Sequence, residues 1–204
     1  MSAWRKGGGF AHIGLRSRKN GDELLKFVGG GQESWNTERV RMAIIAIVAV
    51  DKNLAIGKAG TIPWHYSADM KFFRRQTTRH ACVMGFRTWE SLNKPLKDRL
   101  NIVLSRKRRI EDQPGVIQFT DKSSVLTLAE YLKCDLFVIG GAQVYQAFAD
   151  QIDRWIVTEV PEPAEGADTF MNADFLNGFT AKSVEVLEGG LKVTTYERPD
   201  RNSV

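Results

Sequence analysis

The chain has 204 residues, of which 43% are hydrophobic and 26% are charged, and its formal net charge at pH 7 is +5. This length supports one full hydrophobic core with a short appendage, and it excludes a second domain of ordinary size. No apolar run approaches the ~20 residues that cross a bilayer, and residues 1–20 carry charges and glycines where a signal peptide has its apolar segment, so we expect a cytoplasmic protein without a membrane partner.

The first 41 residues are basic and differ in character from the rest of the chain. They hold eight Lys and Arg against four Asp and Glu, whereas residues 42–204 hold 21 against 20. A β-hairpin arm is expected here, with residues 10–15 paired to residues 23–28 across a turn at Asn20-Gly21, a favoured hairpin dipeptide. Nucleic acid is not an expected partner of the nearly neutral main domain, and the sequence leaves open whether the arm binds it.

From residue 42 onward, strands alternate with helices. Residues 43–50 are apolar and rich in β-branched side chains, which is typical of a strand covered on both faces. Ser67 offers an N-cap to a helix that carries Asp69 in its first turn, where the helix dipole favours an anion. Further strands are expected at residues 81–84, 101–104, 116–119, 136–139 and 155–160, and further helices at residues 88–92, 123–132 and 142–149.

The end of the chain has a different pattern. Residues 181–187 and 191–197 flank Glu188-Gly189-Gly190 and predict an antiparallel hairpin. The preceding alternation of strands and helices implies parallel pairing with crossover helices. We therefore expect an α/β fold with a central, mainly parallel, twisted sheet, helices on both faces and an antiparallel C-terminal hairpin.

Asp69 is the first candidate for chemistry. Its expected helix also carries Phe72 and Phe73, and a carboxylate held against aromatic rings loses hydration. Such an acid has a perturbed affinity for protons or a dedicated cationic or hydrogen-bonding ligand. The simpler alternative is an acid that only stabilises the first turn of its helix.

The two cysteines indicate no metal or disulfide framework. Cys82 and Cys134 lie beside short apolar runs and lack the spacing of metal ligands. We therefore predict reduced packing residues and no bound metal.

Several short motifs occur in a fixed order along the main domain. They are Ala46-Ile47-Val48-Ala49, Ile56-Gly57, Pro63-Trp64, Asp69, Met84-Gly85, Thr88-Trp89-Glu90-Ser91-Leu92, the run from Arg99 to Ser105, and Val138-Ile139-Gly140-Gly141. In order and nearly in spacing, this set resembles that of dihydrofolate reductases over residues 42–198. The resemblance implies a dihydrofolate reductase-like domain at residues 42–204. It also implies NADPH-dependent reduction of 7,8-dihydrofolate to 5,6,7,8-tetrahydrofolate in one-carbon metabolism.

The resemblance implies roles for residues around the substrate. Asp69 would hold the pterin ring and assist its protonation, while Ile62 and Trp64 would exclude water from the hydride path. Arg99 would pair with the carboxylate of the glutamate tail, with Lys94 as a second basic contact. The remaining substrate residues, of which the apolar ones could equally be plain core, are Ile45, Ala46, Met70, Phe73, Leu92, Ile139 and Thr158.

The resemblance also implies a cofactor site. Gly140-Gly141 would let the backbone approach a phosphate, and Arg87 and Arg106 would favour NADPH over NADH. Lys107, Arg108 and Arg109 extend this basic patch, and Phe86 stands where a relative can carry arginine, so the patch is rearranged. An exposed basic loop without a ligand is the alternative. The implied cofactor residues are Ile47, Ile56, Gly57, Lys58, Gly85, Arg87, Thr88, Ser105, Arg106, Gly140, Gly141, Ala142, Gln143, Val144 and Tyr145.

Two other functions are compatible with the sequence. An enzyme of the same fold could reduce another heterocycle, although Asp69 together with Arg99 favours a substrate with an acidic tail. Alternatively, the domain could be a scaffold whose basic arm binds nucleic acid or a partner. We expect a monomer.

Overall fold

The computed structural model describes residues 15–19, 22–26, 35–36 and 42–199. Contacts divide the chain into two units, Met1–Arg41 and Met42–Val204. In the first unit, β1 (Leu15–Lys19) pairs antiparallel with β2 (Asp22–Lys26), which pairs with β3 (Trp35–Asn36). β1 lies C-terminal to the strand expected at residues 10–15, most of which falls outside the described residues. Lys19 is the partner of Asp22, so only the two residues of the predicted turn, 20 and 21, separate the paired strands in the sequence.

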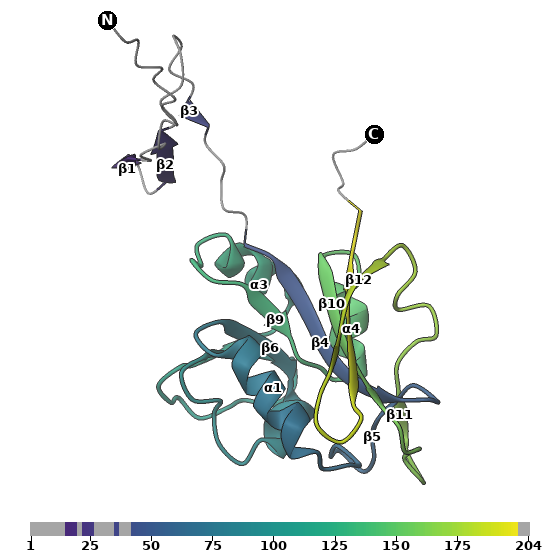
Figure 1. The fold of residues 1–204 in the computed structure, drawn as a ribbon. Helices are drawn as coiled ribbons and strands as arrows, with labels where there is room; N and C mark the ends of the chain where they lie inside the picture. The colour runs from purple at the N-terminus through teal and green to yellow at the C-terminus, as the bar shows by residue number, and fades with distance from the viewer. Residues whose placement is uncertain (1–14, 20–21, 27–34, 37–41, 200–204) are drawn as a thin grey trace, which may run out of the picture. The chain divides into compact units, whose positions relative to one another are not determined.

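Within residues 42–199, the largest sheet has eight strands in the order β12-β13-β10-β4-β9-β6-β7-β8 (Figure 1). Parallel pairing joins all of them from β10 to β8, while β13 is antiparallel to both β10 and β12. The strands are β4 (Ile44–Asp51), β6 (Ala81–Gly85), β7 (Leu100–Leu104), β8 (Val116–Phe119), β9 (Leu136–Val138), β10 (Arg154–Val160), β12 (Thr180–Val186) and β13 (Lys192–Glu197). The expected mainly parallel sheet with its antiparallel C-terminal hairpin is confirmed.

Helices cover both faces of this sheet, also as expected. α1 (Ser67–Thr77) and α2 (Phe86–Ser91) pack on one face, and α3 (Lys122–Ala129) and α4 (Ala142–Phe148) pack on the other. Successive residues of a strand point to opposite faces, so the alternating side chains of β4 enter two separate apolar clusters. This double burial explains why β4 is apolar almost throughout. No helix among the residues described here is long and apolar enough to span a bilayer.

The start of α1 differs from the sequence expectation. Ser67 is already helical, and the N-cap is Tyr66, whose carbonyl accepts the first helical hydrogen bond from the Met70 amide at 3.1 Å. The prediction of Ser67 as a side-chain cap is therefore wrong. The extended conformation that a cap requires falls one residue earlier, and no side chain caps this helix.

A short two-stranded sheet was not predicted from the sequence. It pairs β5 (Ala55–Gly57) with β11 (Thr169–Phe170). Asp51, at the end of β4 and only 2% exposed, anchors this region. One of its carboxylate oxygens accepts from the amides of Asn53 and Ala55, and the other accepts from the amide of Ala164, all at 2.8 Å.

Candidate active site

The parallel strands bring most candidate site residues to one edge of the sheet. β4, β9, β6 and β7 are consecutive neighbours and run in the same direction, so their carboxyl ends share that edge. The crevice outside the carboxyl ends of parallel strands is where open α/β sheets bind ligands. The segments that follow these four strands carry the glycines and basic residues implicated by the sequence.

Asp69 lies in the first turn of α1 and is half-buried. Its Oδ1 accepts a hydrogen bond of 2.9 Å from the hydroxyl of Thr158, a buried residue of β10. Burial raises the pKa of Asp69, and the Thr158 hydrogen bond partly opposes this by favouring the anion. Its Oδ2 has no hydrogen-bond partner among the described residues, so it can accept from a ligand. The carboxylate therefore has a fixed orientation and one available oxygen.

Arg99 is held beside the C-terminal end of α1. Its Nε donates to the Lys97 carbonyl at 2.9 Å, its Nη1 donates to the Thr77 hydroxyl at 3.0 Å, and its guanidinium lies 6.0 Å from the ring centre of Phe73. These contacts leave both hydrogens of Nη2 and one of Nη1 available. The guanidinium can therefore still bind a carboxylate with two donors.

Two residues that position Arg99 were missed in the sequence. Thr77 is fully buried and donates its own hydroxyl to the Phe73 carbonyl at 2.8 Å, which orients the lone pair that Arg99 uses. Asn101 is 1% exposed and bonds the backbone of Leu96, Arg99 and Gly115. The only available signal was an amide side chain at the start of an apolar strand, which is unusual for a buried position.

Three glycines form a close-packed turn region at the ends of β6 and β9. Gly85 donates its amide to the Gly140 carbonyl at 2.8 Å, and a Cβ built on Gly85 would approach Val144 Cγ2 to 3.2 Å. Gly140 has φ +110°, and a Cβ there would meet the Tyr145 ring at 3.2 Å. A Cβ on Gly141 would lie 3.6 Å from the Thr88 hydroxyl. A backbone bare of side chains is what a phosphate needs for close approach.

The side chain of Tyr145 is buried in the interior of the domain. Its hydroxyl donates to the Ile47 carbonyl at 2.7 Å, and its ring packs 5.6 Å from that of Trp155. Burial raises the pKa of Tyr145 far above its usual range. Ala46 is fully buried and packs in the same interior cluster, not in the cluster beneath α1. Neither side chain shares the face that Asp69 occupies, so any ligand contact from Ala46 would come from its backbone.

The segment that carries Ile62 and Trp64 is tied to the loop before β11. Lys58 Nζ donates to the Glu165 carbonyl at 2.7 Å, and the Ala59 amide donates to Asp168 Oδ2 at 2.7 Å. Ile62 is 59% exposed. The indole Nε1 of Trp64 is buried yet has no hydrogen-bond partner in the part of the chain that the structure describes. A buried N–H without a partner is rare and fits a bound ligand or water beside it.

The other predicted residues divide by environment. Ile45 and Ile47 are buried beneath α1, where Phe73, Leu92 and Ile139 pack as partly buried neighbours. Met70 is 50% exposed, and Lys94, Arg87, Arg106 and Gln143 are exposed.

Ser105 is buried, and its hydroxyl donates to the Arg108 carbonyl and accepts from the Arg108 amide. Its hydroxyl therefore shapes the loop. Ile56 and Gly57 lie in β5, and Ala142 and Val144 in α4.

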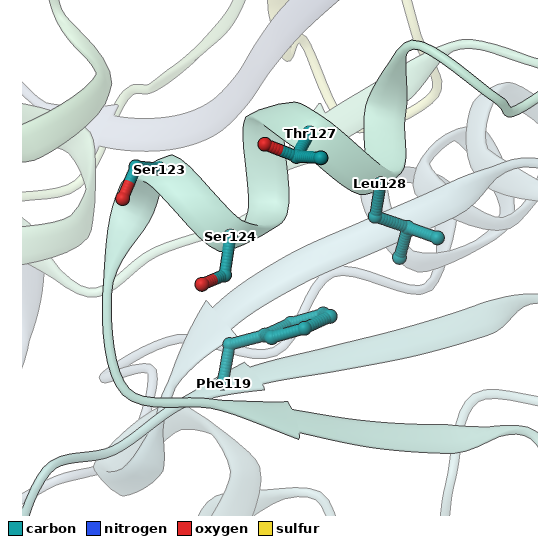
Figure 2. A pocket seen from close by; sticks show the side chains of 5 residues that line it. All are labelled: Phe119, Ser123, Ser124, Thr127 and Leu128. Atoms are coloured by element: carbon teal, nitrogen blue, oxygen red, sulfur yellow. The ribbon is translucent and has the colours of Figure 1, made fainter.

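A cavity of about 420 Å³ lies between the end of β8 and α3 (Figure 2). Its lining residues are Phe119, Ser123, Ser124, Thr127 and Leu128. Both serine hydroxyls bond to Asp121, the N-cap of α3, and these hydrogen bonds, led by that of Ser123, lower the pKa of Asp121 to about 2. The polar groups here already serve the helix cap, so this cavity is not the candidate site.

Neither a metal site nor a reactive thiol is found in the described residues. No group of three or more His, Cys, Asp or Glu side chains in residues 42–199 could hold a metal ion. Cys82 and Cys134 are both free, and burial raises the pKa of Cys82 to about 12. Cys82 is fully buried and packs in the core beneath α1.

A family model, two relatives and one solved structure that are similar to this chain carry the description dihydrofolate reductase. The family model described as dihydrofolate reductase matches residues 43–189. Dihydrofolate reductase HdrB of Haloferax volcanii is 31% identical over 88% of this chain and 92% of its own length. The dihydrofolate reductase of Bacillus subtilis is 35% identical over 64% of this chain and 77% of its own. The structure of the Enterococcus faecalis enzyme complexed with NADP(H) and RAB-propyl superposes with a TM-score of 0.69 at 29% identity, covering 78% of this chain and 98% of that one.

The fold and the site together define an α/β protein with a half-buried acid in α1 and closely packed glycines at the carboxyl edge of a parallel sheet. Both the family model and the relatives extend across most of the second unit. The chain belongs to the dihydrofolate reductase family. It is accordingly an oxidoreductase that uses NADPH to reduce dihydrofolate.

Proposed function

We propose that Asp69 binds the pterin ring of dihydrofolate and assists protonation of the ring nitrogen next to the carbon that is reduced. The observation that carries this proposal is the hydrogen bond from Thr158, which fixes the half-buried carboxylate and leaves Oδ2 available. A paired contact to a ring amide and an exocyclic amine uses one acceptor position on each carboxylate oxygen, and Oδ1 keeps a second lone pair beside its hydrogen bond from Thr158. The raised pKa brings Asp69 closer to the range in which an acid or base works near neutral pH.

Trp64 supports the proton transfer in this proposal. Its buried Nε1–H needs an acceptor, and either a substituent of the substrate ring or a water in the site would supply one. The proton then reaches the substrate directly or through that water. The bulk of the indole also excludes further solvent from the reacting carbon.

The glycine region and its neighbours fit a dinucleotide. Gly85, Gly140 and Gly141 would hold the phosphates against bare backbone, because a side chain at any of the three would occupy that space or strain the turn. Arg87 and Arg106 would add positive charge. NADPH, when bound, supplies the hydride. The remaining cofactor residues named from the sequence keep the roles proposed there, except that the side chains of Tyr145 and Ser105 are engaged within the protein.

Arg99 is proposed to bind the glutamate tail of the substrate. The contacts to Thr77 and Phe73 fix its guanidinium before the substrate arrives, which reduces the entropy lost on binding. Lys94 is exposed and would act as a secondary, long-range contact. We also propose that the protein is cytoplasmic and monomeric. Light scattering of the purified chain would test the monomeric state.

Replacing Asp69 by Asn tests the central proposal. The amide keeps an acceptor for Thr158 but can neither carry the charge nor transfer the proton. We expect the rate of dihydrofolate-dependent NADPH oxidation to fall by several orders of magnitude near neutral pH, and the deficit to narrow in acid as solvent supplies the proton. Absorbance of NADPH with and without dihydrofolate provides the measurement.

The control is Asp112→Asn, the same chemical change at an exposed loop position. It should leave the rate unchanged. Equal rates for the Asp69 variant and the parent across the pH range would exclude Asp69 from the mechanism, even if the parent is a competent reductase.

A further inference from the structure

Two hydrogen-bonded turns precede β12. The Asn177 amide donates to the Asp174 carbonyl at 2.9 Å, and the Phe179 amide donates to the Leu176 carbonyl at 3.0 Å. The second hydrogen bond closes a four-residue turn that has Asn177 and Gly178 at its centre. Gly178 has φ +80°, the value that the third residue of a type II turn requires and that glycine adopts readily. An asparagine therefore comes directly before a glycine in the middle of a tight turn.

Both central residues of this turn are open to solvent. Asn177 and Gly178 are exposed, and a Cβ built on Gly178 would meet no atom within 4 Å. Within residues 42–199, neither the side chain of Asn177 nor the amide of Gly178 makes a hydrogen bond. The side-chain carbonyl carbon of the asparagine and the next backbone nitrogen are therefore both accessible and chemically uncommitted.

The other asparagines of residues 42–199 lack this combination. Asn101 is buried, and its side chain bonds the backbone at both ends of the amide. Asn172 uses its Oδ1 to accept a backbone amide at 3.1 Å. Asn53 and Asn93 are exposed but, like Asn172, precede a residue with a side chain, which crowds the backbone nitrogen. The reactive geometry is thus specific to Asn177 in this part of the chain.

We propose that Asn177 and Gly178 form a site of spontaneous covalent modification. The Gly178 nitrogen, after losing its proton to water or hydroxide, attacks the side-chain carbonyl carbon of Asn177. A new C–N bond closes a five-membered succinimide ring, and the C–N bond of the side-chain amide breaks with release of ammonia. Water then adds to one of the two ring carbonyls and opens the ring, which yields aspartate or isoaspartate. No atom is oxidised or reduced, and water is the only co-reactant.

The isoaspartate product would disturb the packing of the turn. Its main chain runs through the former side chain, which adds one methylene group to the backbone. Leu176 and Phe179, on either side, pack against the core cluster beneath α3 and α4, and the Phe175 ring lies edge-on to buried Trp155 at 5.0 Å. A longer backbone in a closed turn displaces these side chains from a close-packed core. Both products also add a negative charge near Asp174.

Ageing of the purified full chain in mildly alkaline buffer tests the proposal, with peptide mass spectrometry and fragmentation to localise each conversion. Asn177 should convert at least about tenfold faster than Asn93 or Asn172, which corresponds to a barrier lower by about 1.4 kcal/mol. Conversion should be slower in mildly acidic buffer, because the attacking nitrogen must lose its proton. Conversion of Asn177 at the rate of Asn93 would overturn the proposal.

Two variants connect the modification with its effect on stability. Asn177→Gln keeps an amide but would have to close a six-membered ring, so no conversion is expected at this position. Asn177→Asp, freshly prepared, carries the new charge without the extra methylene. The aged parent should melt a few degrees below both aged Asn177→Gln and fresh Asn177→Asp.

Asn20-Gly21 is present in the parent and in Asn177→Gln, so the difference between these two aged proteins isolates Asn177. An equal loss of melting temperature in both would overturn the assigned effect on packing. An aged parent that melts with fresh Asn177→Asp would assign the effect to charge and overturn the role of the longer backbone.

Discussion

Asp69 illustrates how a residue selected for chemistry can weaken the fold that holds it. Its pKa is raised in the folded protein by burial. Its favourable contribution to stability is therefore present below the ordinary pKa of about 3.9 and is lost as pH rises through the folded-state value. At neutral pH the ionised side chain destabilises the chain without its ligand. Functional sites commonly hold such unfavourable groups.

The same Asp69→Asn variant should consequently be more stable than the parent. We expect its melting temperature to be a few degrees higher at pH 7.5, because Asn accepts from Thr158 without the desolvation of a charge. The gain should disappear near pH 3, where the parent carboxyl is protonated. Thermal melting followed by circular dichroism at both pH values measures this, and a lower melting temperature for the variant at pH 7.5 would contradict it.

At the scale of elements, Asp51 connects the end of β4 to two segments that flank the site. Burial acts to raise the pKa of Asp51, but three backbone N–H donors outweigh it, so the pKa lies below its ordinary value. Its stabilising contribution is therefore present above about pH 4 and is lost as pH falls through the lower folded-state value. Ala55, whose amide donates to Asp51, is the β5 residue that pairs with Phe170 of β11.

Asp51→Ala should lower the free energy of unfolding by about 2–4 kcal/mol at neutral pH, because three buried amides lose their acceptor. Asp51→Asn should lose roughly half as much, since one oxygen still serves Asn53 and Ala55. The differences in free energy of unfolding between these variants and the parent should narrow below about pH 4. Urea unfolding measures these values, with Asp112→Ala as the exposed control. Losses no larger than that of the control would show that the anchor is dispensable.

At the scale of the whole molecule, the contacts of the chain divide at Arg41 and Met42. All the residues assigned to the site fall in the second unit. The first residues of that unit matter to it, because the Ala43 amide donates to Asp135 at 3.0 Å and the Ile44 amide donates to Asp153 at 2.9 Å. The boundary between accessory and essential residues should therefore be sharp.

A chain that begins at Met42 should keep its turnover number and Michaelis constants for both substrates within about twofold of the full chain. A chain that begins at Ile45 is the matched comparison. It should melt at a distinctly lower temperature, because Asp135 and Asp153 lose their backbone donors. Loss of reductase activity in the first variant would assign an essential role to residues 1–41.

The sequence by itself determined the architecture of the second unit. Apolar runs such as that of β4 predict buried parallel strands, because a strand covered on both faces cannot tolerate polar side chains. The paired glycines at 140 and 141 are a weak signal alone and gain their meaning from their order among the other motifs; the structure gives a steric reason for the first, because Gly140 has a positive φ and a Cβ there would meet Tyr145. The short pairing of β5 with β11 was not readable, because strands of two or three residues carry no periodic signal.

Only the tertiary structure decided how the side chains meet. Thr158 and Asp69 are 89 positions apart. Their hydrogen bond exists because α1 packs on the face of the sheet toward which the Thr158 side chain of β10 points. Likewise, Arg108 reaches Phe86 because β6 and β7 are neighbours, and Ala46 turns away from Asp69 because alternate residues of β4 face opposite sides. Strands, helices and turns follow from local sequence patterns, whereas contacts between distant side chains depend on how these elements pack.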